Sequence, residues 1–173
     1  PAYNWWNECL HGVGRSGTAT VFPQPIGMAA SFDESLMEHV AQAISDEARA
    51  KYNQYKTFGE TGIYQGLTFW SPNINLFRDP RWGRGHETYG EDPLLTGRMG
   101  VAFVRGIQGP NPDLPDVIAT PKHFAVHSGP ESTRHSANVF VSAHDLEDTF
   151  LPAFRAAIVD GKAKLLRDDY CDG

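Results

Sequence analysis

An α/β fold with parallel strands is predicted by the order of apolar segments along this 173-residue chain. Short extended apolar stretches alternate with longer amphipathic ones, so that strand, loop and helix follow one another. Units of this kind place consecutive strands parallel and connect them by right-handed crossovers. Because no repeat, low-complexity tract or linker interrupts the pattern, a single domain is expected over residues 1–173.

Helical spacing of apolar residues predicts amphipathic helices over residues 33–52, 92–108 and 142–159. Each predicted helix starts with a suitable capping or first residue, and a glycine follows the second and the third helix. The expected caps or first residues are Ser31 or Asp33, Asp92 or Pro93, and Ser142. The residues expected to face the core are Leu36, Val40, Ile44 and Ala48, then Leu95, Met99, Ala102, Phe103 and Ile107, and then Leu146, Phe150, Phe154 and Ile158.

Three shorter apolar stretches are predicted to be strands, at residues 26–30, 66–76 and 116–121. Pro72 interrupts the second stretch, so we expect this strand to run into a loop. The first stretch follows a loop between residues 12 and 20 that is rich in Gly and Thr.

The chemistry of the chain is concentrated in residues 77–87 and 119–127, which follow predicted strands. At this edge of an α/β sheet, side chains are presented to a ligand. A sugar offers hydroxyls at fixed angles and one weakly apolar ring face, which charged groups and a Trp can bind. The candidate donors are Arg81, Arg84, Lys122 and His123, the acceptors Glu87 and Glu91, and the flat surfaces Trp70 and Trp82. This combination suits a polyhydroxylated ligand.

A structural interpretation competes for part of this set. The cations between Arg78 and Arg84 can form an ion-pair network that braces the loop against Glu87, Glu91 and Asp92. We favour this role for Arg78, Asp79 and Arg81, and ligand binding for Lys122 and His123. Packing or structural roles are favoured for Trp5, Trp6 and His11.

Several partners are disfavoured by the composition. A net charge of −6 without a Lys/Arg-rich block argues against nucleic acid, whose phosphates require a basic surface. No apolar run approaches the roughly 18 residues of a membrane span. Cys9 and Cys171 lack CxxC spacing, and the seven histidines form no ligand pattern. Neither a disulfide, a metal site nor any cofactor is therefore predicted.

Together with the opening stretch at residues 3–12, these motifs resemble the N-terminal barrel domain of glycoside hydrolase family 3, in particular its bacterial β-xylosidases and β-glucosidases. The resemblance runs from residue 1 to about residue 164 and implies part of a (β/α)₈ TIM-type barrel. Since a complete barrel usually needs about 250 residues, we expect this one to be incomplete at both ends. The implied activity is exo-acting hydrolysis of terminal β-xylosyl or β-glucosyl residues, from oligosaccharides or aryl and alkyl β-glycosides. The resemblance favours a periplasmic or secreted bacterial enzyme.

The same resemblance assigns substrate binding to Glu8, Trp70, Arg84, Lys122 and His123. A sixth candidate, His135, lies in the loop beyond the last predicted strand, where the catalytic loops of barrels lie. Many β-glucosidases of the family have Asp in place of Glu8. The extra methylene of Glu leaves less room beside the sugar, which favours a pentose such as xylose.

Retaining hydrolysis requires a nucleophilic carboxylate and an acid/base. The family places its nucleophilic Asp just before a Cys-Asp pair, but Tyr170 precedes Cys171 in this chain, so the catalytic residues are unidentified. Relative to the family, we expect segments to be missing after Lys164 and after Tyr170. Residues 165–170, which lie between them, are expected to be part of a helix. The acid/base is expected from a C-terminal α/β sandwich domain outside this sequence.

Two alternatives stay open. The chain can be a catalytically silent sugar-binding fragment, or a half-barrel whose open strand edges favour pairing with a second copy. Within the family, β-N-acetylglucosaminidases use a His with the spacing from Lys122 to His135. Their Gly-Asp-Thr residues in this loop are replaced here by residues 129–131, Gly-Pro-Glu.

Overall fold

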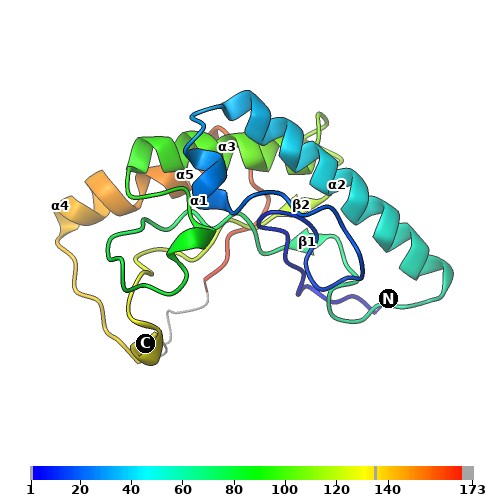
Figure 1. The fold of residues 1–173 in the computed structure, drawn as a ribbon, viewed down its shortest axis with the longest axis horizontal. Helices are drawn as coiled ribbons and strands as arrows, with labels where there is room; N and C mark the ends of the chain where they lie inside the picture. Colours follow the sequence, from blue (N-terminus) through cyan, green and yellow to red (C-terminus); the bar gives the residue numbers. More distant parts are fainter. Residues whose placement is uncertain (1, 135, 169–173) are drawn as a thin grey trace.

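A computed structural model describes residues 2–134 and 136–168. Its main helices lie on one side of a short parallel sheet, and long loops extend on the other side (Figure 1). Helix α3 (Pro93–Gln108) contacts both α2 (Glu34–Thr57) and α5 (Pro152–Val159). The architecture is of the predicted α/β class.

Helix α3 is the centre of the core. Pro93 occupies its first turn as predicted, and Asp92 Oδ1 accepts a backbone hydrogen bond at 2.6 Å. It ends at Gly109, whose φ of 77° lies in the left-handed region. Helix α2 approaches so closely that a Cβ on Gly106 would lie 2.3 Å from Glu38 O. Glycine at position 106 therefore allows the two helices to pack together.

Helix α2 begins at the predicted cap, where Asp33 accepts a hydrogen bond from the backbone N–H of Leu36 at 2.9 Å. It extends past the predicted end at residue 52, because its last turns contact the 12–20 loop. Tyr55 and Ser16 share a side-chain hydrogen bond of 2.8 Å, and Lys51 Nζ donates to Ser16 O at 2.8 Å. The buried residues of α2 are Met37, Ala41, Ile44, Ser45 and Ala48.

The predicted helix over residues 142–159 is present but broken. Ser142 caps α4 (Ala143–Asp145), and a π-helical turn, η3 (Leu146–Phe150), follows it. Helix α5 then begins at Pro152, which has no N–H to continue the hydrogen-bond pattern. The Pro therefore separates the helical segments.

Two residues predicted to face the core are exposed. Leu36 is 51% exposed, because the packed face of α2 begins at Met37, and Ile158 is 43% exposed near the end of α5. Phe150 and Phe154 are buried, as predicted.

Residues 26–30, predicted to be a strand, form a helix instead, α1 (Pro25–Ala29). Pro25 presets φ for the first helical turn, and Gln24 O accepts hydrogen bonds from the N–H groups of Gly27 and Met28 at 2.9 and 3.0 Å. A short apolar run does not distinguish a buried strand from a buried helical turn. Pro25 was the sequence signal for the helix.

Strands β1 (Thr68–Phe69) and β2 (Ile118–Ala119) form a parallel pair with Thr68 opposite Ile118. Both are shorter than the predicted strands at 66–76 and 116–121. Beyond Pro72 the alignment continues as an isolated bridge between Asn73 and Lys122. The two segments therefore leave the sheet side by side, which brings the two predicted binding stretches together.

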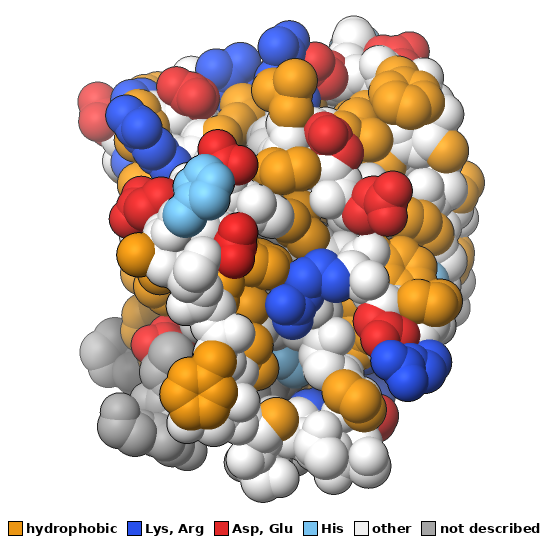
Figure 2. All heavy atoms as spheres, turned by 90° about the vertical axis from the view of Figure 1, so that its left-hand side faces the viewer, with side chains coloured by type: hydrophobic (Ala, Val, Ile, Leu, Met, Phe, Trp, Pro, Cys, Tyr) orange, Lys and Arg blue, Asp and Glu red, His pale blue; other side chains and the backbone are white. Residues whose placement is uncertain are grey.

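At the α4 end of the molecule, side chains of both charge signs lie among apolar ones (Figure 2). This face therefore shows no basic field. Within residues 2–134 and 136–168, no helix is long and apolar enough to cross a membrane, and no three His, Cys, Asp or Glu side chains are grouped to hold a metal ion.

Candidate functional site

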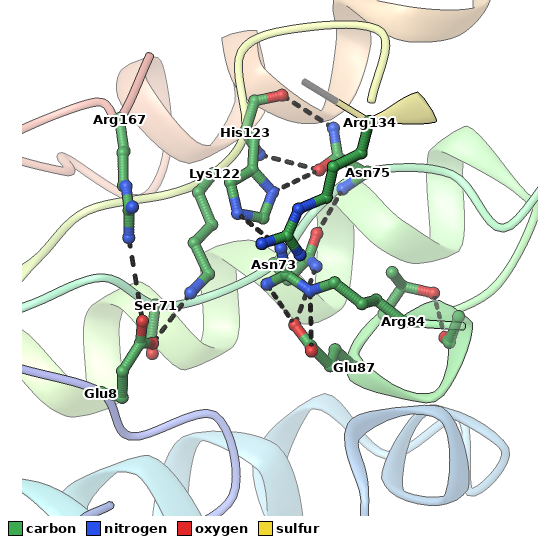
Figure 3. A network of polar contacts seen from close by, with 12 residues as sticks. Glu8, Ser71, Asn73, Asn75, Arg84, Glu87, Lys122, His123, Arg134 and Arg167 are labelled. Atoms are coloured by element: carbon green, nitrogen blue, oxygen red, sulfur yellow. Dashed lines mark hydrogen bonds and ion pairs between the residues drawn. The ribbon is translucent and has the colours of Figure 1, made fainter. Parts of the chain in front are cut away.

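A partly buried ion pair joins the opening stretch of the chain to the segment after β2. Lys122 is 1% exposed, and its Nζ donates to Glu8 Oε2 at 2.8 Å (Figure 3). Glu8 is held beside the end of β1, because the N–H of the next residue, Cys9, donates to Ser71 Oγ at 3.1 Å. Burial lowers the pKa of Lys122, and the carboxylate of Glu8 opposes this shift.

A second ion pair is formed by Arg84. The short 3₁₀ helix η1 (Gly85–Glu87) places Glu87 against it, so that Nε donates to Oε1 at 2.9 Å and Nη2 to Oε2 at 2.7 Å (Figure 3). Burial raises the pKa of Glu87, but the hydrogen bonds and charge of Arg84 outweigh it, so this pKa lies below its ordinary value. Glu87 is therefore ionised at neutral pH. The predicted bracing of the loop by Glu87 is present, through Arg84.

His123 is fixed by Asn75. Its ring Nδ1 lies 2.9 Å from Asn75 Oδ1, and its Nε2 lies 3.4 Å from Arg84 Nη1. Burial, and then the charges of Lys122 and Arg84, lower its pKa far below the ordinary value. A neutral ring that donates from Nδ1 to Asn75 and accepts from Arg84 at Nε2 satisfies both contacts. The contact with His123 thus helps to hold the Arg84 side chain in place.

A polar cavity of about 420 Å³ is lined by three of the predicted binding residues, Glu8, Arg84 and Lys122. Trp70 and His123 are not among its lining residues. Its remaining walls are Trp6, Leu10, His11, Arg15, Gln24, Tyr64, His86 and Glu87. Rigidly held charged groups beside aromatic rings are suited to binding hydroxyl groups in such a cavity.

Two side chains pack against the half-buried indole of Trp70. Its ring centroid lies 4.9 Å from that of Trp6, and the guanidinium carbon of Arg167 lies 3.4 Å above the ring. His135, the sixth predicted binding residue, is outside the described residues, as are Tyr170 and Cys171.

Trp82, considered as a flat sugar-binding surface, is 3% exposed and makes edge contacts with Phe77 and His127. That interpretation is wrong, because the loop buries the ring. The structural interpretation of Arg81 agrees with its exposed ion pair to Asp79, where Arg81 Nε lies 2.9 Å from Asp79 Oδ1.

The structural interpretation also fits Arg78 and His11, whereas Trp5 and Trp6 are 57% and 45% exposed and Trp6 lines the cavity. Arg78 donates to Ser128 and stacks 4.9 Å above the Phe150 ring. His11 Nδ1 contacts Phe22 O at 2.9 Å. These contacts hold loop segments together, and His11 also lines the cavity.

Sequence reasoning missed Arg167. Residues 165–168 are not helical, contrary to the expectation, because their backbone pairs with the segment after β2. Arg167 Nη1 lies 3.7 Å from Glu8 Oε1 (Figure 3). The only sequence signal was a cation directly after the apolar pair Leu165-Leu166.

Known proteins of similar sequence are named as xylosidases. A xylan 1,4-beta-xylosidase of Xylanibacter ruminicola is 49% identical over 180 residues, which cover 98% of this chain and 21% of that protein. Beta-D-xylosidase 3 of Arabidopsis thaliana is 44% identical over 177 residues, covering 93% of this chain and 22% of that protein. The chain therefore spans about a fifth of the length of these relatives.

Solved structures agree with this result. A family 3 exo-beta-xylosidase, XlnD, in complex with a xylobiose aziridine probe superposes with a TM-score of 0.86 at 34% identity, covering 97% of this chain and 22% of that chain. A beta-glucosidase from Listeria innocua in complex with glucose gives a TM-score of 0.71 at 34% identity, covering 92% and 20%. The sequence model of the glycosyl hydrolase family 3 N terminal domain matches residues 4–166. The chain belongs to glycoside hydrolase family 3 and carries sequence of its N-terminal domain.

Proposed function

We propose that this chain is the sugar-holding part of an exo-acting, retaining β-glycosidase that releases terminal β-xylosyl or β-glucosyl residues. The observation that carries the proposal is the convergence of Lys122, Glu8 and Arg84 on one polar cavity. Relatives named as xylosidases and a solved beta-glucosidase support the substrate class.

The charges at the cavity are suited to binding a sugar. Each carboxylate, Glu8 and Glu87, is held by a cation, so its remaining lone pairs can accept hydrogen bonds from hydroxyls in a fixed direction. Lys122 can donate to a hydroxyl with the hydrogens that Glu8 does not use. Rigid contacts of this kind orient a sugar ring before its bond is cleaved.

The two carboxylates of the cavity are poorly suited to the cleavage itself. An acid/base must carry a proton at the working pH, whereas Arg84 lowers the pKa of Glu87 and keeps it ionised. The Lys122 ammonium donates to the Glu8 carboxylate and offsets its negative charge, which weakens Glu8 as a nucleophile. We assign both to substrate binding, and the nucleophile and the acid/base to other parts of the enzyme, with the acid/base on a C-terminal α/β sandwich domain.

Among sugars, we propose a pentose as the better ligand. Glu8 lines the cavity and contacts the Lys122 ammonium at 2.8 Å. Because Glu is one methylene longer than Asp, we infer that it leaves less room beside a bound sugar. A xylosyl residue, which has no exocyclic CH₂OH group, needs less room than a glucosyl residue. The names of the similar xylosidases agree with this preference.

The proposal is tested by giving the 173-residue chain nitrophenyl β-xyloside and nitrophenyl β-glucoside, and by titrating it with xylose and glucose in a calorimeter. We expect xylose to bind more tightly than glucose. Because the nucleophile and the acid/base are assigned to other parts of the enzyme, we expect no turnover by this chain alone, and retention of the anomeric configuration by the whole enzyme. Absence of binding of both xylose and glucose by this chain would contradict the proposal, and a whole enzyme that turns over neither nitrophenyl glycoside would leave only a catalytically silent sugar-binding protein.

A further inference from the structure

We propose that Arg167 is a positioning residue of this site, which fixes the carboxylate of Glu8 and the ring of Trp70 for sugar binding. This inference rests on the proposed function. It assigns a role to a residue that lies far from the binding motifs in the sequence, and it changes the role of Trp70 from a sugar platform to a support.

The backbone of Arg167 is held on both sides by the segment that carries Lys122. Arg167 N donates to Pro121 O at 3.0 Å, and Phe124 N donates to Arg167 O at 3.0 Å. The side chain is 18% exposed. The backbone position from which this side chain starts is therefore fixed relative to Lys122. Its guanidinium group projects toward Glu8 (Figure 3).

Arg167 gives Glu8 a second cation. Lys122 Nζ lies 2.8 Å from Oε2 of this carboxylate, and Arg167 Nη1 lies 3.7 Å from Oε1. Because each oxygen faces a different cation, rotation of the carboxylate would weaken both interactions. The outward lone pairs of Glu8 are thereby held in one direction, as an acceptor for a sugar hydroxyl must be.

The planar guanidinium of Arg167 also lies 3.4 Å above the Trp70 ring, at stacking distance. A sugar cannot stack on the same face of the Trp70 ring, because Arg167 already occupies it. Trp70 is also in contact with Trp6, which does line the cavity. A chain of contacts thus runs from Glu8 through Arg167 and Trp70 to Trp6.

The test compares Arg167→Met and Arg167→Lys with Arg155→Met, a matched change at an exposed arginine of α5. Xylose affinity is measured by calorimetry, and circular dichroism verifies the fold. We expect Arg167→Met to weaken xylose binding about tenfold, as for a coupled charged pair. Arg167→Lys keeps the charge but not the planar stack, so it is expected to recover part of the loss. Arg155→Met is expected to bind as the unmodified chain does.

A double-mutant cycle with Glu8→Gln separates positioning from general support of the fold. Because Arg167 acts largely through Glu8, Arg167→Met is expected to cost about tenfold in the unmodified chain but only about threefold when position 8 is already Gln, where the contact with Trp70 remains. An equal loss in both backgrounds, or full binding by Arg167→Met, would overturn this inference while leaving the proposed function intact. Absence of xylose binding by the unmodified chain would instead contradict the proposed function, and the inference with it.

Discussion

Replacing Lys122 by Met is expected to weaken xylose binding by about a hundredfold. Met keeps most of the length of the side chain but removes the ammonium that holds Glu8 at 2.8 Å. Truncating one partner of a buried, hydrogen-bonded charge pair typically costs about 2–5 kcal/mol, and each 1.4 kcal/mol is about a factor of ten in affinity. Calorimetric titration with xylose measures the change.

The matched control is Lys56→Met at the exposed end of α2. We expect this variant to bind xylose with unchanged affinity. The Lys122 variant must also retain the circular dichroism spectrum of the unmodified chain, so that the loss reports on the site. A folded Lys122→Met protein that binds xylose within about threefold of the unmodified chain would show that this ion pair does not hold the sugar.

The largest effect on stability is expected for Phe103→Ala. Phe103 is fully buried in α3, the helix that contacts both α2 and α5. Removing a buried phenyl ring leaves a cavity and typically costs about 3–5 kcal/mol. For a domain of this size, that loss corresponds to a melting temperature lower by roughly 10 °C.

Phe140→Ala provides the control, because Phe140 is 89% exposed. Its melting temperature is expected to stay within about 2 °C of that of the unmodified chain, as surface substitutions typically change stability by less than about 0.5 kcal/mol. Equal losses for the two variants in thermal unfolding followed by circular dichroism would contradict the placement of α3 at the centre of the core.

The helices could be predicted from the sequence where local signals agreed with packing. Helix α3 has a proline in its first turn, an acidic cap, an apolar face and a terminal glycine, and its bounds match the prediction. Helix α1 was missed because its apolar run is too short to show a period, so that Pro25 alone marked the helix. The apolar character of a segment indicates that it is buried, whereas a strand forms only where its backbone hydrogen-bonds to a facing segment. The strands are therefore shorter than predicted.

The site was predictable where strand ends determine it. The parallel register of β1 and β2 places the residues after each strand side by side, and Lys122, Glu8 and Arg84 meet at one cavity. The partners of these groups could not be read from the sequence. Arg167 reaches Glu8 across 159 positions, through backbone pairing that no local pattern encodes.

The most direct test of the central claim is a crystal structure of the chain grown with saturating xylose. The sugar is expected in the polar cavity, with hydroxyl groups within hydrogen-bond distance of Lys122 Nζ, the Glu8 carboxylate and the Arg84 guanidinium. Xylose bound elsewhere, or a cavity without sugar in which the Lys122–Glu8 pair is unchanged, would contradict it.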